Sequence, residues 1–315
     1  DEGLIDYVAR GYVGGDDNPL AELDVIANPR FSMNGEAIDA SIIDAALLRD
    51  VLHEAEGAEA NVATGYHAVE FLLWGQDLNG TGPGAGDRPW TDYAQGDACT
   101  HGNCDRRGEY LRAATGLLVD DLAEMVGHWT AQGDARLALL ADENTGLAAM
   151  LTGMGSLSYG ELAGERIRLG LLLNDPEEEQ DCFSDNTPWS HFYDGVGIRN
   201  VYVGQYRRVD GTTLEGASLS ALVAAADPAL DTALRAGLDA SVAALQVMVD
   251  TAEGGMAYDM MLAPGNAEGE AVIMGAVNAL VSQTRDIERA IAALGLEGIS
   301  LEGSDSLDSP SSIFH

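Results

Sequence analysis

The chain of 315 residues contains no lysine, because all 16 of its basic residues are arginine. Without lysine it cannot form a Schiff base with pyridoxal phosphate or a carbonyl substrate, and it cannot supply the lysine of a phosphate-binding P-loop. Basic charge is scarce, since 52 acidic residues give a net charge of −36. Nucleic acids and anionic membrane surfaces are bound through basic side chains. We therefore expect neither as a partner.

Long apolar runs are also missing, and none approaches the roughly 18–20 residues of a membrane span. We expect no membrane span in this chain. The first residues, DEGLIDYVARGY, have neither the basic nor the apolar region of a leader. If the protein is exported, we expect that its leader is absent from this sequence.

Cysteine is scarce, with three in the chain. Cys99 and Cys104 enclose the short segment CTHGNC, whose glycine and asparagine favour a turn, and we predict a disulfide between them. His101 in this loop would suit zinc, but the second half of a structural zinc site is missing. A disulfide indicates an oxidising compartment.

Helical periodicity dominates the sequence, and strand signals are few. Residues 38–56, 61–76, 105–129 and 135–173 carry apolar side chains at helical spacing. Residues 79–98 are rich in glycine and proline and are predicted to be a loop. A seam typical of helical bundles runs near the end, at Ile273, Val277, Leu280, Thr284, Ile287, Ile291 and Leu294.

The sequence therefore predicts an all-α protein of two packed helical bundles with a long ordered loop at 174–212. We expect an N-terminal bundle over 1–140, a C-terminal bundle over 141–296 and a flexible tail over 297–315. The functional site is expected at the interface between the bundles.

One apolar segment, GYHAVEFLLWGQD at 65–77, contains a histidine and a glutamate three positions apart. On a helix His67 and Glu70 share one face, and the apolar residues around them predict a buried helix. Burying an ionised carboxylate costs several kcal/mol unless it is paired or bound to a metal. A core histidine bonded to its neighbour is one explanation. An inward-facing His-x-x-Glu pair in a carboxylate-rich metal site is the other, and the one that we favour.

A second polar stripe is predicted on a helix over 153–173, where Ser158, Glu161, Glu165 and Arg168 fall four and three residues apart. Its small companion positions, including Gly160 and Gly164, indicate close approach by a neighbouring backbone. Surface pairing of Glu161 or Glu165 with Arg168 explains the stripe equally well. As a site, Glu161 and Glu165 would add oxygen ligands to those of His67 and Glu70.

Residues around this set would support the metal. Arg168 would balance its charge, Ser158 and Tyr66 would lie beside it, and Asp181 or Asp185 of the long loop would close the site. Mixed nitrogen and oxygen ligands suit iron or zinc and do not choose between them.

The segment GYHAVEFLLWGQD resembles the Gly-x-His-x-x-Glu motif of the imelysin-like proteins, which are classed as M75 peptidases. The segments CTHGNCDRRGEYL, MGSLSYGELAGERI and EEEQDCFSDNT are similar to the iron-regulated protein A branch of that family. The likeness extends over about residues 1–295. One departure is Pro188, where the family usually has the histidine of DNTH, although His191 is near.

The resemblance implies two helical bundles with the His67/Glu70 motif at their interface, export to the periplasm or outer membrane, and a role in iron acquisition. It also implies that the chain lacks the first helices of its N-terminal bundle. The ligand would be a metal ion or an iron chelate, and a receptor at the outer membrane or another surface protein would be the partner.

Two alternatives to a metal-binding protein stay open. The first is a metallopeptidase, although a hydrolytic zinc site needs about three protein ligands, a water and a general base. The second is a receptor adaptor in which His67 and Glu70 form a purely structural pair.

Overall fold

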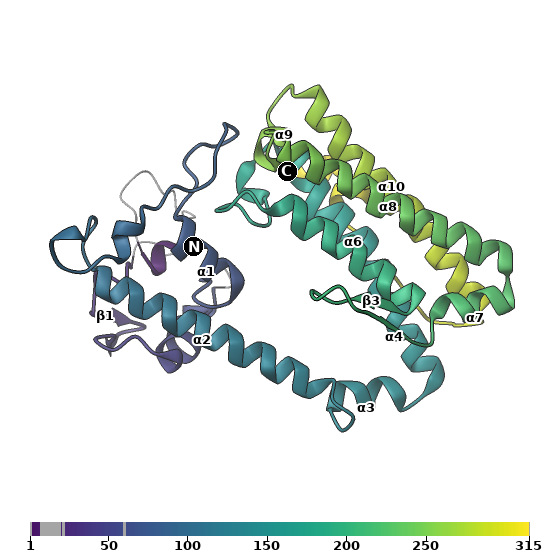
Figure 1. The fold of residues 1–315 in the computed structure, drawn as a ribbon, viewed down its shortest axis with the longest axis horizontal. Helices are drawn as coiled ribbons and strands as arrows, with labels where there is room; N and C mark the ends of the chain where they lie inside the picture. Colours follow the sequence, from purple (N-terminus) through teal and green to yellow (C-terminus); the bar gives the residue numbers. More distant parts are fainter. Residues whose placement is uncertain (1, 7–19, 21–22, 59–60, 315) are drawn as a thin grey trace. The chain divides into compact units, whose positions relative to one another are not determined.

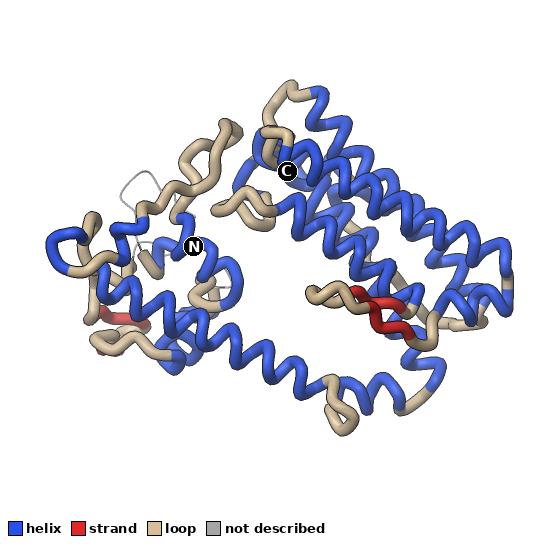
Figure 2. Tube along the Cα trace, in the orientation of Figure 1, coloured by secondary structure: helices blue, strands red, loops and turns tan. Residues whose placement is uncertain are grey.

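The computed structural model describes residues 2–6, 20, 23–58 and 61–314. This part of the chain is mostly helical and has two short strand pairs, which confirms the all-α prediction (Figures 1 and 2). The chain divides into two compact units. Unit 1 comprises Asp1–Leu78 and Ala85–Gly133, and unit 2 comprises Asn79–Gly84 and Asp134–His315.

Unit 1 combines two α-helices with short irregular elements within its described residues. Helix α1 packs against α2, which also contacts the 3-10 turn Trp90–Tyr93. The strands β1 and β2 form an antiparallel hairpin in which Arg30 pairs with Asp39. The bounds are β1 Arg30–Met33, β2 Glu36–Asp39, a π-helix Leu47–Leu52, α1 Gly65–Trp74, α2 Cys104–His128, and 3-10 turns at Glu2–Leu4, Ala55–Gly57, Trp90–Tyr93 and Gly96–Ala98.

A buried ionic network holds the N-terminal segment of unit 1 to α2. The guanidinium of Arg107 donates to both carboxylate oxygens of Asp6, at 2.7 and 3.2 Å, and Arg88 donates to the same carboxylate at 2.7 Å. Burial raises the pKa of Asp6, but the hydrogen bond from Arg107 and the charge of Arg88 outweigh it and hold that pKa below its usual value. The carboxylate therefore stays ionised in a buried position.

Unit 2 is a helical bundle. Helix α10 packs lengthwise on α8 and on a π-helix, and α6 lies along the other side of α8 (Figure 1). The bounds are α3 Asp134–Leu140, α4 Glu143–Ser156, the π-helix Leu157–Arg168, α5 Leu169–Leu173, α6 Thr187–Val203, β3 Gln205–Arg207, β4 Thr213–Glu215, α7 Leu219–Ala226, α8 Pro228–Glu253, α9 Tyr258–Leu262, α10 Ala267–Ala293, α11 Asp305–Asp308, and 3-10 turns at Pro176–Glu178 and Pro310–Phe314.

The core of unit 2 contains the predicted seam of α10, whose side chains at Ile273, Val277, Leu280, Thr284, Ile287 and Ile291 are buried. Their spacing places them on one face of the helix, against α8 and the π-helix. A second antiparallel hairpin, of β3 and β4, follows α6. The seam thus marks the face on which the bundle closes.

Several predicted elements differ from the observed ones. Residues 38–56 are not one helix, since they hold the end of β2, a π-helix and a 3-10 turn. The long loop predicted over 174–212 is largely replaced by α6, which starts with Pro188 in its first turn, where a missing backbone N–H costs nothing. The predicted helix over 135–173 is broken at residues 141–142 and is a π-helix from Leu157 to Arg168.

Residues 301–308, here called the C-terminal segment, are packed on unit 2, contrary to the flexible tail that the sequence indicated. Arg168 donates from Nε to the backbone carbonyl of Ser306 at 2.8 Å, and Tyr159 donates to Asp308 at 2.7 Å. Gly160 makes room for this backbone: a Cβ there would lie 2.8 Å from the carbonyl oxygen of Glu302. The predicted close approach at the glycines is therefore made by the chain itself.

Candidate functional site

The candidate site in unit 1 is built on α1. The helix begins at Gly65, whose φ of +89° favours glycine, and ends before Gly75, which has a φ of +73°. Two hydroxyl groups fix its position, since Tyr110 donates to the carbonyl of Ala63 at 2.9 Å and Tyr93 donates to the carbonyl of Leu72. These bonds give the short helix a defined place against α2.

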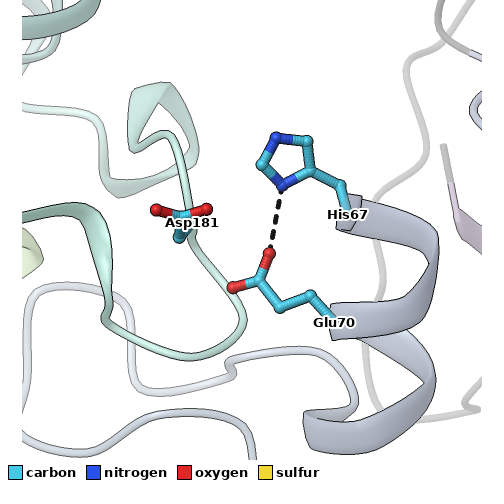
Figure 3. A group of neighbouring side chains, drawn as sticks. All are labelled: His67, Glu70 and Asp181. Carbon is cyan, nitrogen blue, oxygen red and sulfur yellow. Dashed lines mark hydrogen bonds and ion pairs between the residues drawn. The ribbon is translucent and has the colours of Figure 1, made fainter. Parts of the chain in front are cut away.

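His67 and Glu70 lie on one face of α1, as their spacing predicts (Figure 3). The Nδ1 atom of His67 is 3.1 Å from Oε2 of Glu70, and the two side chains are 36% and 10% exposed. The helix is not buried all round, however, because Tyr66, Leu73 and Trp74 are exposed. These three residues are three or four positions from Glu70 and so flank it, while the buried Ala68, Phe71 and Leu72 lie on the opposite side of the helix. The carboxylate is therefore sheltered on a face of α1 that is itself partly exposed.

This geometry allows two arrangements of a metal. If Nδ1 carries the proton, it donates to Glu70, the carboxylate orients the ring, and Nε2 is the nitrogen that would coordinate a metal. If Nδ1 is deprotonated, both Nδ1 and Oε2 can bind one ion, because the two atoms are already 3.1 Å apart. In both arrangements the pair supplies a mixed nitrogen and oxygen donor set, which suits iron or zinc.

The remaining described histidines of unit 1 are each beside an acidic residue of their own. His53 lies 4.0 Å from Glu54, and His128 lies 3.7 Å from Glu124. The Nδ1 atom of His101, next to the disulfide, lies 2.6 Å from Oδ1 of Asp92. Within the described part of unit 1, His67 is therefore the histidine that has a buried carboxylate on a shared helical face.

The predicted disulfide is confirmed, since Cys99 and Cys104 are bonded at 2.01 Å. The loop that it closes is tied to the ionic network of this unit. Asp92 receives a hydrogen bond from Thr100 at 2.6 Å, and Arg107 donates to the carbonyl of Gly102 at 3.0 Å. Cys182 of unit 2 is half-buried and forms no disulfide within the described residues.

The predicted ligands of unit 2 have partners within that unit. Glu161 forms an ion pair with Arg166 at 2.7 Å, and Glu165 accepts a hydrogen bond from Ser304 at 2.5 Å. The pair at 161 and 166 is five residues apart, as the wider turn of a π-helix allows. Arg168 donates to the backbone carbonyl of Ser306 in the C-terminal segment, whereas one interpretation of the sequence paired it with Glu161 or Glu165. A metal on Glu161 or Glu165 would have to replace these partners.

Ser158 is fully buried and structural in its bonding. Its hydroxyl donates to the carbonyl of Met154 at 2.7 Å and accepts from Gln283 at 2.8 Å. Asp181 accepts a hydrogen bond from Ser190 on α6, and its backbone N–H donates to Thr187 at 2.9 Å. Asp181 thus lies at the start of α6.

An acidic group that the sequence did not predict as a cluster lies in unit 2, although Asp185 was among the predicted site residues. Oxygen atoms of Glu179, Asp185 and Asp259 are all within 4.8 Å of one another. Glu179 and Asp259 are buried, and Asp185 is half-buried. The acidic run EEEQD at 177–181 was a visible signal for Glu179. Nothing in the sequence pointed to Asp259, which comes from α9.

The electrostatics of this group oppose ionisation. Burial, and then the charges of Asp259, Asp185 and Asp181, raise the pKa of Glu179 to about 9, against a hydrogen bond from Thr187 that lowers it. His191 of α6 is fully buried, and its ring packs edge-on against Tyr258, the residue before Asp259, at 5.5 Å between centroids. Burial lowers the pKa of His191 to about 3, so its imidazole is neutral.

The family described as imelysin, peptidase family M75, matches residues 1–287. The chain belongs to the imelysin family. A comparison with curated proteins gave no match. As an imelysin-family protein it carries histidine and acidic groups that are compatible with a metal ion.

Not one of the described helices is both long enough and apolar enough to cross a bilayer. This agrees with the expectation from the sequence.

Proposed function

We propose that this imelysin-family protein is an exported metal-binding protein that serves iron acquisition, and that His67 and Glu70 supply ligands to the metal. One observation carries the proposal. A glutamate that is 10% exposed faces the ring nitrogen of a histidine at 3.1 Å on the same helix. A buried carboxylate needs compensation, and a cation held jointly with the imidazole provides it.

Two further observations support the setting of the proposal. The disulfide of unit 1 is the kind of bond that forms in an oxidising compartment, such as the periplasm. The excess of acidic residues, which gives a net charge of −36, attracts cations from solution toward the protein. Export, a function at the outer membrane and a receptor partner are inferred from the family and from these two features.

The proposed site needs oxygen ligands beyond the pair on α1. From the sequence we propose Glu161 and Glu165 for this role, with Asp181 or Asp185 as the closing carboxylate. Both glutamates are bound to other side chains in unit 2, so each is tested separately. Loss of metal binding in Glu165→Gln but not in Glu161→Gln, for example, would assign the ligand directly.

The test is a titration of purified, metal-stripped protein with Fe(II), Fe(III) and Zn(II), beside the variants Glu70→Gln and Glu124→Gln. Glu124 is a matched control, because it also neighbours a histidine on a helix but is 74% exposed. We expect Glu70→Gln to weaken binding at least about tenfold, the scale at which even supporting carboxylates act. Glu124→Gln should bind as the natural protein does.

Equal binding by the natural protein and a folded Glu70→Gln variant would refute the proposal. The pair would then be a buried hydrogen bond, as expected of a receptor adaptor. The metal-loaded protein is also assayed on a mixture of unstructured peptides. Cleavage that is lost in Glu70→Gln would establish the metallopeptidase alternative, which the family description raises.

A further inference from the structure

The acidic group of unit 2 joins three segments that are far apart in the sequence. Glu179 follows the 3-10 turn Pro176–Glu178, Asp185 lies two residues before the first residue of α6, and Asp259 is the second residue of α9. All three belong to unit 2. The fold therefore brings their carboxylates together without any contribution from α1.

The distances within this group suit a shared cation. Calcium binds carboxylate oxygens at about 2.3–2.6 Å, so two ligands on opposite sides of one ion are up to about 5 Å apart. The oxygens of Glu179, Asp185 and Asp259 lie within 4.8 Å of one another. Three carboxylates offer a hard, oxygen-only donor set, and calcium or a similar hard cation prefers such ligands.

Glu179 adds an independent sign of a missing ligand. The residue is 5% exposed, and its Oε1 atom is buried and has no hydrogen-bond partner in the described structure. The charged groups that act on it, Asp259, Asp185 and Asp181, are all acidic. A buried carboxylate oxygen without a donor is costly, and three carboxylates side by side repel one another.

We propose that Glu179, Asp185 and Asp259 bind a hard, oxygen-coordinated cation of the calcium class. The cation clamps the segment 179–185 onto α9. It occupies the place of the donor that Oε1 of Glu179 lacks, and it offsets the repulsion among the three carboxylates.

This second site goes beyond the proposed iron site and differs from it in chemistry. The pair on α1 includes an imidazole, whereas the group in unit 2 offers oxygen atoms alone. Its role is structural, because it fixes the chain between α5 and α6. Backbone order there also positions Asp181, which is hydrogen-bonded to Thr187 and Ser190 of α6.

The experiment uses the full chain, stripped of metal, at moderate salt. Calcium is titrated by calorimetry, and the midpoint of thermal unfolding is followed in parallel. Terbium(III) luminescence, excited through tyrosine, is a second readout, because the buried Tyr258 adjoins Asp259 in the chain. The variants are Glu179→Gln and Asp185→Asn, with Glu253→Gln at the exposed end of α8 as the control for the acidic surface.

Asparagine tolerates the left-handed conformation of Asp185, whose φ is +55°, so this variant keeps the fold even if Glu179→Gln does not. We expect one calcium site per chain that raises the unfolding midpoint in the natural protein and in Glu253→Gln. Affinity should drop at least about tenfold in both site variants. Glu70→Gln should retain this calcium site, so its failure and that of the iron site are distinguishable.

Two results would overturn the inference. One is calcium and terbium binding that is the same in Asp185→Asn and Glu253→Gln, which would place the ions on the acidic surface. The other is the absence of any calcium-dependent rise in the unfolding midpoint of the natural protein. In that case a protonated Glu179 hydrogen-bonded to its acidic neighbours accounts for the cluster.

Discussion

The substitution Gly160→Ala tests the packing of the C-terminal segment on the π-helix. A Cβ atom at this position would lie 2.8 and 2.9 Å from the backbone carbonyl oxygens of Glu302 and Gly303. These contacts are with backbone rather than with the end of a flexible side chain. The C-terminal segment therefore has to move away from the helix to accept a methyl group.

Two opposing effects set the magnitude. Alanine in place of glycine favours a helix by about 1 kcal/mol. Displacing the segment breaks or exposes three hydrogen bonds, from Arg168 to Ser306, from Tyr159 to Asp308 and from Ser304 to Glu165. Each contributes about 1 kcal/mol, and the two that end on carboxylates contribute more. We therefore expect a net loss of roughly 2 kcal/mol in the free energy of unfolding.

The assay is urea unfolding of the full chain, together with limited proteolysis near residue 301. The control is Gly153→Ala, since Gly153 is also in the middle of a helix but has open space at its Cβ position. Gly153→Ala should stabilise the protein, and Gly160→Ala should destabilise it and speed up cleavage. If both variants are stabilised to the same extent, the segment does not rest on Gly160 and the reasoning is wrong.

Three other perturbations have defined outcomes. In metal-free protein the pKa of Glu179 is raised to about 9, so the protonated side chain stabilises the fold at low pH, and this stability is lost as the pH rises above about 4.5. In urea unfolding between pH 5 and 8, Glu179→Gln should remove up to about 1.4 kcal/mol of this loss per pH unit. An unchanged dependence of the free energy of unfolding on pH would contradict the prediction. Arg107→Met removes a partner of the buried Asp6 carboxylate and should lower the free energy of unfolding, measured in urea, by about 3 kcal/mol. The exposed Arg289→Met should lower it by about 0–1 kcal/mol, and equal losses would count against the buried network. Reducing the Cys99–Cys104 disulfide should lower the free energy of unfolding by about 2 kcal/mol, measured by urea titrations with and without reductant. No change would mean that the loop keeps its conformation without the disulfide.

The sequence predicted best where apolar side chains alone mark a helical face. Residues 105–129 were expected to be helical, and α2 extends from Cys104 to His128. Its buried positions include Tyr110, Ala114 and Leu117, four and three residues apart. The seam of α10 was found for the same reason. Apolar residues at helical spacing indicate directly which face of a helix is buried.

Helix α6 was missed because its buried face is not apolar in composition. Pro188, His191, Gly195, Ile198 and Tyr202 are buried and fall three and four residues apart. This is a helical period, but proline, histidine and glycine occupy three of its five positions. Their burial depends on neighbours from α8 and α9, which local patterns do not show. The segment therefore read as a loop.

The candidate sites differ in the same way. The pair on α1 could be predicted because His67 and Glu70 are three residues apart on an α-helix. The prediction that Ser158, Glu161 and Glu165 share one face was based on α-helical spacing, whereas the segment is a π-helix. The wider turn pairs Glu161 with Arg166. The group around Glu179 depends entirely on tertiary structure, since α9 contributes its third carboxylate.

The docking of the C-terminal segment has a consequence for biosynthesis. The contacts of this segment with the π-helix join residues separated by 138 to 149 positions along the chain. A ribosome releases the helix long before it makes the segment that covers the helix, and translocation in the same direction has the same order. The face of the π-helix at Gly160 and Gly164 is therefore uncovered in the nascent protein until residues 301–308 have been made. Unit 2 completes its packing only after residues 301–308 have been made.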